Sequence, residues 1–178
     1  MKRIAVFTGS RPGRDPAFAE AAADLGRRAA ERGVGLVYGG GRVGLMGVVA
    51  DAAADAGGEV VGVIPAHMGV AEDAHHGITR LEVVEDMHAR KERMAALADG
   101  FVALPGGIGT LEELFEIWTW RQLGLHAKPV TLYDVDGFWR PLLTMIDHMV
   151  ESGFLSPRTR DELQITTGPD RAIDCLLT

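Results

Sequence analysis

Several features are scarce or missing in this sequence. Cys175 is the only cysteine among 178 residues, so the chain can form no intramolecular disulfide, and this favours a reducing, cytoplasmic location. No apolar stretch approaches the roughly 18–20 residues of a membrane-spanning helix, and the start MKRIAVFTGS is typical of a first strand rather than a signal peptide. The formal net charge is −7, and nothing builds a basic face overall, so we expect neither a nucleic-acid partner nor a membrane partner.

Residues for several common chemistries are also missing. No Gly-Lys pair exists, which argues against a Walker A loop, and no serine lies in a G-x-S-x-G motif. A pyridoxal-phosphate enzyme needs a Schiff-base lysine. The chain has only three lysines, and none has a strand-end context that suits this role: Lys2, Lys91 and Lys128. We expect no metal ion either, because one acidic and histidine-rich loop lacks metal-ligand spacing: Glu72, Asp73, His75 and His76.

Short apolar runs alternate with longer alanine-rich stretches along the chain. The runs predict strands over residues 3–8, 35–38, 59–65, 80–85, 101–104 and 129–133. The longer stretches predict helices over residues 15–33, 45–56, 87–98, 110–123 and 138–151, with one or two short helices in the tail. This alternation is typical of an α/β fold, here a Rossmann-like, doubly wound parallel sheet with helices on both faces, in a single domain over residues 1–178. Ligands bind such sheets beyond the carboxyl ends of the strands, so we expect the site after the second, fourth and fifth strands.

Two glycine clusters follow predicted strands and begin helices. Residues 39–44 follow the second strand, and residues 106–110 follow the fifth. Unpaired N–H groups at such a helix N-terminus favour an anion, although a single glycine loop is often only a tight turn. The first cluster matches G-x-G-x-x-G, but a dinucleotide site needs that motif after the first strand and an acidic residue near the end of the next. Neither condition holds, which leaves a smaller ligand such as a nucleoside monophosphate or a sugar phosphate.

Charged residues lie near both clusters in the predicted fold. Arg90 and Lys91 begin the helix after the fourth strand, and Glu112, Glu113 and Glu116 lie in the first turns after the second cluster. A cation and a carboxylate at this edge can contact a phosphate and a ribose. A solvated helix face and a favourable interaction with the helix dipole would account for the same residues, and spacing does not decide among the three glutamates.

Three separated segments match a known set of motifs. Residues 105–113, PGGIGTLEE, match P-G-G-x-G-T-x-x-E, residues 87–91, MHARK, match M-H-x-R-K, and residues 39–47, GGGRVGLMG, match G-G-G-x-x-G-L-M-G. With these motifs the chain resembles the LOG (Lonely Guy) family of cytokinin riboside 5′-monophosphate phosphoribohydrolases, whose members are often mislabelled as lysine decarboxylases. The likeness covers nearly the whole chain.

The resemblance implies hydrolysis of the N-glycosidic bond of a nucleoside 5′-monophosphate, AMP included, to free base and ribose 5-phosphate. It implies no cofactor, and it implies that Arg90 and Glu113 are the catalytic pair. It also implies a substrate site formed by Glu72, Arg90, Lys91, Gly107, Ile108, Gly109, Thr110, Leu111, Glu112, Glu113 and Thr119. At the phosphate, we expect further contacts from Ser10, Gly40, Gly41, Met46 and Gly106.

Other functions remain open from the residues alone. A nucleotide carrier would keep the glycine loops without needing both Arg90 and Glu113. A base-exchanging transferase would use Glu113 as a covalent nucleophile, and a lysine decarboxylase is disfavoured by the scarcity of lysine. The preferred base, adenine or N6-prenylated adenine, stays undecided.

A homodimer is expected on two grounds. The helix predicted over residues 110–123 has apolar side chains on more than one face, which a small domain does not bury alone unless the tail helices cover them: Phe115, Ile117, Trp118 and Trp120. The family resemblance also implies a homodimer.

Overall fold

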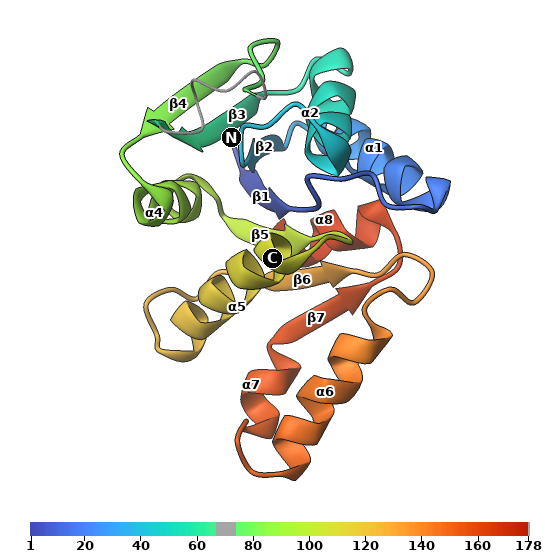
Figure 1. Cartoon of the computed structure of the whole chain (residues 1–178), viewed down its shortest axis with the longest axis vertical. Coiled ribbons are helices and arrows are strands. Elements are labelled where there is room, and N and C mark those ends of the chain that lie inside the picture. Colours follow the sequence, from blue (N-terminus) through green and yellow to red (C-terminus); the bar gives the residue numbers. More distant parts are fainter. Residues whose placement is uncertain (67–73, 178) are drawn as a thin grey trace.

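A computed structural model describes residues 1–66 and 74–177 of the chain. Within them, seven parallel strands form one sheet in the order β4-β3-β2-β1-β5-β6-β7 (Figure 1). The strands are β1 (Arg3–Phe7), β2 (Gly35–Tyr38), β3 (Val60–Pro65), β4 (Arg80–Val84), β5 (Gly100–Ala103), β6 (Val130–Tyr133) and β7 (Leu163–Thr166). The predicted α/β fold with a parallel, Rossmann-like sheet is confirmed.

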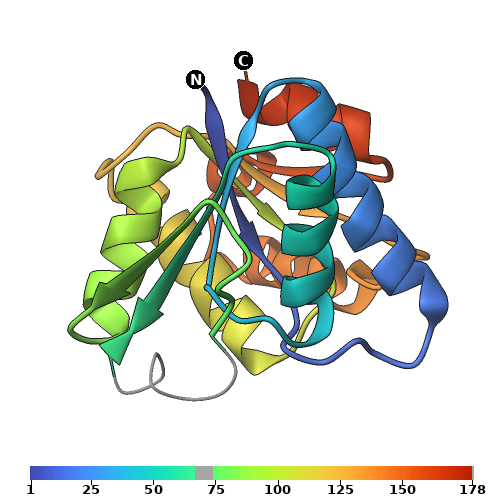
Figure 2. The ribbon, with the colours of Figure 1, turned by 90° about the horizontal axis from the view of Figure 1, so that it is seen from above.

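Helices cover both faces of this sheet. Figure 2 shows α1, α2 and α8 on one side and α4 and α5 on the other, while α6 and α7 extend beyond the β7 edge in Figure 1. The helices are α1 (Pro16–Glu31), α2 (Gly44–Asp55), α4 (Met87–Leu97), α5 (Ile108–Gln122), α6 (Arg140–Glu151), α7 (Pro157–Asp161) and α8 (Pro169–Leu177). In the described part of the chain, no helix is long and apolar enough to cross a membrane.

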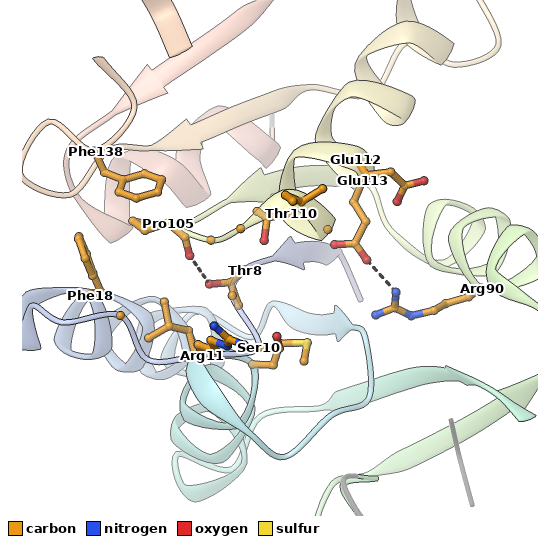
Figure 3. Close-up of a pocket in the computed structure, with 18 of the residues that line it drawn as sticks. Thr8, Ser10, Arg11, Phe18, Arg90, Pro105, Thr110, Glu112, Glu113 and Phe138 are labelled. Atoms are coloured by element: carbon orange, nitrogen blue, oxygen red, sulfur yellow. Dashed lines mark hydrogen bonds and ion pairs between the residues drawn. The ribbon is translucent and has the colours of Figure 1, made fainter. Parts of the chain in front are cut away.

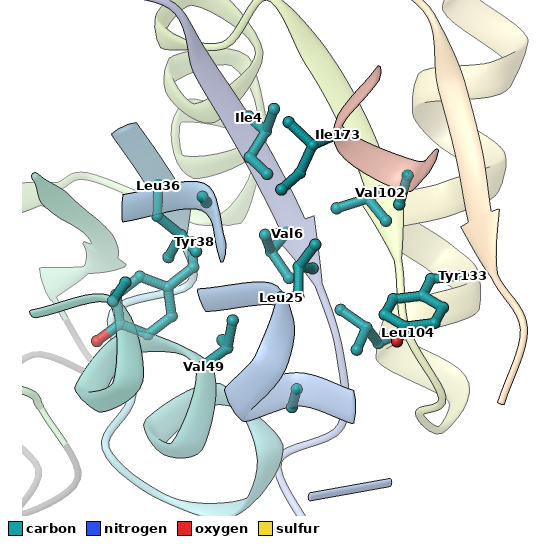
Figure 4. Close-up of a cluster of buried hydrophobic side chains, with 14 of the residues drawn as sticks. Ile4, Val6, Leu25, Leu36, Tyr38, Val49, Val102, Leu104, Tyr133 and Ile173 are labelled. Carbon is teal, nitrogen blue, oxygen red and sulfur yellow. The ribbon is translucent and has the colours of Figure 1, made fainter. Parts of the chain in front are cut away.

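The central strands are buried on both faces, which explains their nearly continuous apolar sequences. On one face, Ile4 and Val6 of β1 pack with Leu25 of α1, Val49 of α2 and Ile173 of α8 (Figure 4). The opposite face forms a second cluster between β1, β5 and β6 and the helices α4, α5 and α6, built on Phe7, Met94, Phe101, Leu114, Trp118, Leu132 and Ile146. The sheet is thus held rigidly from both sides.

The sequence predicted six of these strands to within a residue or two at each end. The start of α1 is also as predicted, because the Asp15 carboxylate accepts a hydrogen bond of 3.0 Å from the Ala17 N–H and Pro16 begins the helix. Strand β7 was not predicted. It is a four-residue edge strand in which only Leu163 and Thr166 are buried, so it has no apolar run.

The aromatic side chains of α5 pack within the chain. Ile117 and Trp118 are buried, and Trp118 Nε1 donates a hydrogen bond of 3.2 Å to the carbonyl of Thr159 in α7. Phe115 and Trp120 are half-buried against the same core cluster. The tail therefore contacts Trp118, whereas Phe115 and Trp120 stay partly exposed.

The strand order reverses between β1 and β5. From β1 the chain continues to β2, β3 and β4 on one side of the sheet, whereas β5, β6 and β7 follow on the other side. In open α/β sheets, ligands bind at this switch point, beyond the carboxyl ends of the two strands. A ligand is therefore expected at the loops after β1 and β5. The loop after β5 was among those predicted, whereas the loop after β1 was predicted only through Ser10.

Candidate active site

A pocket of about 660 Å³ lies at this switch point (Figure 3). Its walls come from the loops after β1 and β5, the starts of α1, α2, α4 and α5, and the loop before α6. The lining residues are Thr8, Gly9, Ser10, Arg11, Gly13, Phe18, Leu45, Met46, Met87, Arg90, Pro105, Gly106, Gly107, Ile108, Gly109, Thr110, Glu112, Glu113 and Phe138. Its size suits a small organic ligand such as a nucleotide.

The two switch-point loops are joined directly at the Pro105 carbonyl. This oxygen accepts a hydrogen bond of 3.2 Å from the Gly9 N–H and another of 3.0 Å from Thr8 Oγ1. The loops also approach closely at Gly106, where a Cβ atom would overlap Thr110 Oγ1 and lie 2.9 Å from the Gly9 nitrogen. Gly106 is therefore needed for the two loops to meet at the floor of the pocket.

The first turn of α5 presents backbone donors to the pocket. Gly107 is the N-cap residue and has no side chain that could accept from the helix. The first N–H groups of a helix have no partner within the helix, so those of Ile108, Gly109 and Thr110 are available to an anion. Burial of Thr110 places its hydroxyl beside this turn, where it adds a further donor. This end of α5 has the properties of a phosphate site.

Arg90 and Glu113 form a buried ion pair at the other end of the pocket. Arg90 Nη1 donates a hydrogen bond of 2.9 Å to Glu113 Oε1, and each side chain is only 10% exposed. Arg90 Nε also donates to the Val63 carbonyl at 3.1 Å, which fixes the plane of the guanidinium. Burial raises the pKa of Glu113 to about 7, against the opposing effect of the Arg90 charge. We refer to these two residues as the Arg90–Glu113 pair.

Gly39 leaves space for the Arg90–Glu113 pair. A Cβ atom at Gly39 would overlap Arg90 Nη2, so even alanine would displace the guanidinium. The first glycine cluster thus serves the site through packing. Gly44, the last glycine of the cluster, also acts through packing, because with a φ of +61° it lies against the peptide between Ser10 and Arg11.

Lys91 points away from the pocket into a second ion-pair network. Its ammonium contacts Glu112 Oε1 and lies 2.8 Å from Glu116 Oε2, and its side chain is 6% exposed. Burial alone would lower the pKa of Lys91, but the hydrogen bond from its ammonium to Glu112 and its ion pair with Glu116 hold that pKa above its ordinary value. Adjacent residues of α4 therefore pair with different glutamates of α5, which locks the two helices together.

The structure brings together most of the residues predicted for the site. Ten of them line the pocket: Ser10, Met46, Arg90, Gly106, Gly107, Ile108, Gly109, Thr110, Glu112 and Glu113. Five others lie outside the lining: Gly40, Gly41, Lys91, Leu111 and Thr119. Glu72 falls outside the described residues.

The backbone around the first glycine cluster binds other parts of the protein. The N–H groups of Leu45 and Met46 at the start of α2 both donate to the Gly9 carbonyl, at 3.0 and 3.3 Å. The Gly40 carbonyl accepts from the His75 N–H at 2.9 Å. The start of α2 therefore holds the loop after β1 in place, and the phosphate contacts predicted for Gly40 and Gly41 have no counterpart in the pocket lining.

Sequence reasoning missed several lining residues. Arg11 and Phe18 belong to the loop after β1 and the first turn of α1, and Phe138 comes from the loop after β6. The rings of Phe18 and Phe138 meet edge to face with centroids 5.6 Å apart, at the end of the pocket opposite the Arg90–Glu113 pair (Figure 3). The available signal was the run SRPGRD directly after the first strand, since a proline and a glycine there indicate a loop at the ligand edge.

The chain is similar to known proteins over most of its length. A family model described as "Possible lysine decarboxylase" matches residues 46–176. A cytokinin riboside 5′-monophosphate phosphoribohydrolase from Rhodococcoides fascians is 50% identical over 173 residues, covering 97% of this chain and 87% of the relative. One from Arabidopsis thaliana is 53% identical over 160 residues, covering 90% of this chain and 74% of the relative. The chain belongs to the LOG family.

Solved structures share the fold at greater distance. A molybdenum cofactor binding protein from Rippkaea orientalis superposes with a TM-score of 0.72 at 22% identity, covering 97% of this LOG-family chain and 93% of the other. The molybdenum cofactor carrier protein from Chlamydomonas reinhardtii gives 0.71 at 23% identity, covering 97% and 94%. At such low identity, these likenesses concern the fold alone.

The positions of the lysines matter because the family model is described as a possible lysine decarboxylase, and a pyridoxal-phosphate enzyme needs a lysine in its site. None of the three lysines of this LOG-family chain lines the pocket. Lys91 is held by two carboxylates, and Lys128 Nζ donates to the Ala95 carbonyl at 2.6 Å. The described pocket lining therefore contains no lysine that could form a Schiff base.

Proposed function

We propose that this protein hydrolyses the N-glycosidic bond of nucleoside 5′-monophosphates, AMP and cytokinin riboside 5′-monophosphates included, and releases the free base and ribose 5-phosphate. The observation that carries the proposal is the buried Arg90–Glu113 pair in one pocket with the uncapped first turn of α5. A phosphate held at that turn leaves the ribose one helical turn further on, beside Glu113. The names of the close relatives support the same reaction.

In the proposed reaction, one water molecule is added across the bond between C1′ and the base nitrogen. The bond breaks with its electron pair on the base, and the sugar passes through a state resembling an oxocarbenium ion. The Glu113 carboxylate stabilises that positive charge or orients the attacking water. Water supplies the hydroxyl at C1′, and its proton passes to the departing base.

Arg90 has an electrostatic role in this mechanism. A guanidinium does not lose its proton in proteins, so Arg90 is a poor general acid. Its positive charge stabilises negative charge on the departing base or holds the phosphate. The Val63 carbonyl and the Glu113 carboxylate keep it oriented for either task. The substrate therefore meets a cation that is already in position.

The direct test incubates the purified protein with AMP and quantifies adenine and ribose 5-phosphate by chromatography. Equal amounts of both products support hydrolysis. Nucleotide binding without products would instead identify a carrier. Incorporation of labelled adenine into AMP would identify a transferase with a covalent intermediate on Glu113. Release of an amine from added lysine would identify the protein as a lysine decarboxylase instead.

We further propose that residues 1–178 form one domain that acts as a homodimer in the cytoplasm. Exposed apolar side chains at both ends of α5 support a second copy, since Ile108 is 88% exposed and Leu123 and Leu125 follow the helix. The single cysteine suits a reducing compartment. Size-exclusion chromatography with light scattering tests the assembly, and a monomer at micromolar concentration would contradict it.

A further inference from the structure

The charges that line the pocket are not balanced evenly. Among the residues that the structure describes, four charged side chains line it, and three of them have partners on the protein. Arg90 and Glu113 neutralise each other, and Glu112 is paired with Lys91. Arg11 is exposed and forms no ion pair or side-chain hydrogen bond with any residue in the ranges that the structure describes. Within residues 1–66 and 74–177, the pocket lining therefore carries one uncompensated positive charge, on Arg11.

The backbone beneath Arg11 is held firmly in place. The preceding Gly9 carbonyl accepts from two N–H groups at the start of α2, and Gly44 packs against the peptide that joins Ser10 to Arg11. Any side chain at Gly44 would overlap that peptide. Because its backbone is fixed, Arg11 projects from a defined position even though its guanidinium is in solvent.

The position of Arg11 is suited to an anion at the start of α5. In Figure 3, Arg11 lies beside Ser10 on one wall of the pocket, and Thr110 lies on the opposite wall. An anion between these walls would meet the Ser10 and Thr110 hydroxyls, the N–H groups of the first turn of α5 and the Arg11 guanidinium. A guanidinium offers paired N–H donors that match two phosphate oxygens at once.

We infer that Arg11 selects substrates that carry a 5′-phosphate monoester and discriminates against the corresponding nucleosides. This inference rests on the proposed function and adds a residue to it. The Arg90–Glu113 pair has no net charge to offer a phosphate dianion once Glu113 is ionised. The free guanidinium of Arg11 supplies that charge without having to break an existing ion pair, so little desolvation or reorganisation opposes binding.

The test compares Arg11→Gln with Arg14→Gln by steady-state kinetics on AMP and on adenosine. Arg14 is exposed, lies three residues further along the same loop and is absent from the pocket lining, so its variant has the same change in charge. For Arg11→Gln, the ratio of kcat/KM for AMP to kcat/KM for adenosine should fall by about tenfold or more, mainly through KM. Arg14→Gln should leave the ratio unchanged, and Arg11→Lys should give an intermediate ratio because the charge remains and the paired donors are lost.

An unchanged ratio in Arg11→Gln, or an equal fall in both variants, would overturn the inference. Equilibrium binding separates this result from a failure of the proposed function. If the wild-type protein releases no adenine, the proposed hydrolysis fails, yet titration calorimetry with AMP and with adenosine still tests Arg11. A selective loss of AMP affinity in Arg11→Gln would support its role, and no selective loss would refute it.

Discussion

Arg90 and Glu113, from two helices that begin on either side of the switch point, meet at 2.9 Å with nine tenths of each side chain buried. A buried pair of this kind contributes little net stability, because desolvation of both charges offsets their attraction. Its position in a pocket with an open helix N-terminus instead suits the catalytic role proposed for it. The pair gives a cation and a carboxylate a fixed geometry before any ligand arrives.

Glu113→Gln is expected to abolish base release and to leave AMP binding nearly intact. Glutamine keeps the shape and can still accept a hydrogen bond from Arg90, but it cannot offer a negative charge to the developing sugar cation. We expect kcat to fall by about 10²–10³ or more, the usual effect of removing one electrostatic stabiliser. Adenine release and titration calorimetry measure the two quantities. Turnover of AMP at the wild-type rate would refute the assignment of Glu113.

The pH profile should report the ionisation of Glu113. If the carboxylate is the active form, a pKa of about 7 means that kcat rises with pH between about 6 and 8 and then levels off. Initial rates at saturating AMP measure this, and saturation limits the contribution of the substrate phosphate. A kcat that falls over the same range would show that Glu113 acts in its protonated form, as a general acid.

The ionisation of Glu113 should also affect stability, which should fall with rising pH whereas kcat rises. The pKa of Glu113 in the folded protein, about 7, lies above its ordinary value of 4.5, so the folded state binds the proton more tightly than the unfolded state. The stabilisation is complete below the unfolded-state pKa and is lost as pH rises through about 7. The Tm of the wild-type protein relative to Glu113→Gln should therefore decrease from pH 5 to pH 8. A constant difference would mean that Glu113 has an ordinary pKa.

Much of the fold was predictable because central parallel strands are buried on both faces. Residues 35–38 and 130–133 are continuous apolar or threonine-containing runs, and sequence pattern alone located them. Strand β7 lies at an edge and has two exposed residues among four, so the same rule does not identify it. Burial, rather than strand formation itself, produces the apolar sequence pattern from which a strand is predicted.

The site was predictable in part, for a different reason. Local pattern predicts a phosphate site at the start of α5, but it predicts an equal role for residues 39–44, which follow a strand away from the switch point. Strand order is a non-local property that local pattern does not contain. The choice of Glu113 over Glu112 and Glu116 likewise depends on how α4 meets α5. Only the structure shows that Lys91 occupies the other two glutamates.

Gly39→Ala should disable the site from outside the pocket. The added Cβ atom would overlap Arg90 Nη2 and displace the guanidinium from Glu113. We expect kcat to fall by about tenfold or more, since misplacing a catalytic group by about 1 Å costs up to 10²-fold. Gly168→Ala is the matched control, because no atom lies within 4 Å of its added Cβ and neither glycine has a positive φ. Equal activity in the two variants would show that Arg90 tolerates displacement.

Lys91→Met should lower stability more than it changes substrate binding. The resemblance to LOG proteins predicts a substrate contact, whereas the structure places Lys91 outside the pocket, between Glu112 and Glu116. Removing the ammonium leaves the half-buried Glu116 without its partner, at a cost of about 1–3 kcal/mol, or about 2–12 °C in Tm. If Lys91 positions α5, adding Glu116→Gln should recover part of that loss, and KM for AMP should rise less than about threefold. A rise in KM of tenfold or more with an unchanged Tm would instead establish the direct contact, and would mean that Lys91 leaves its two glutamates when the nucleotide binds.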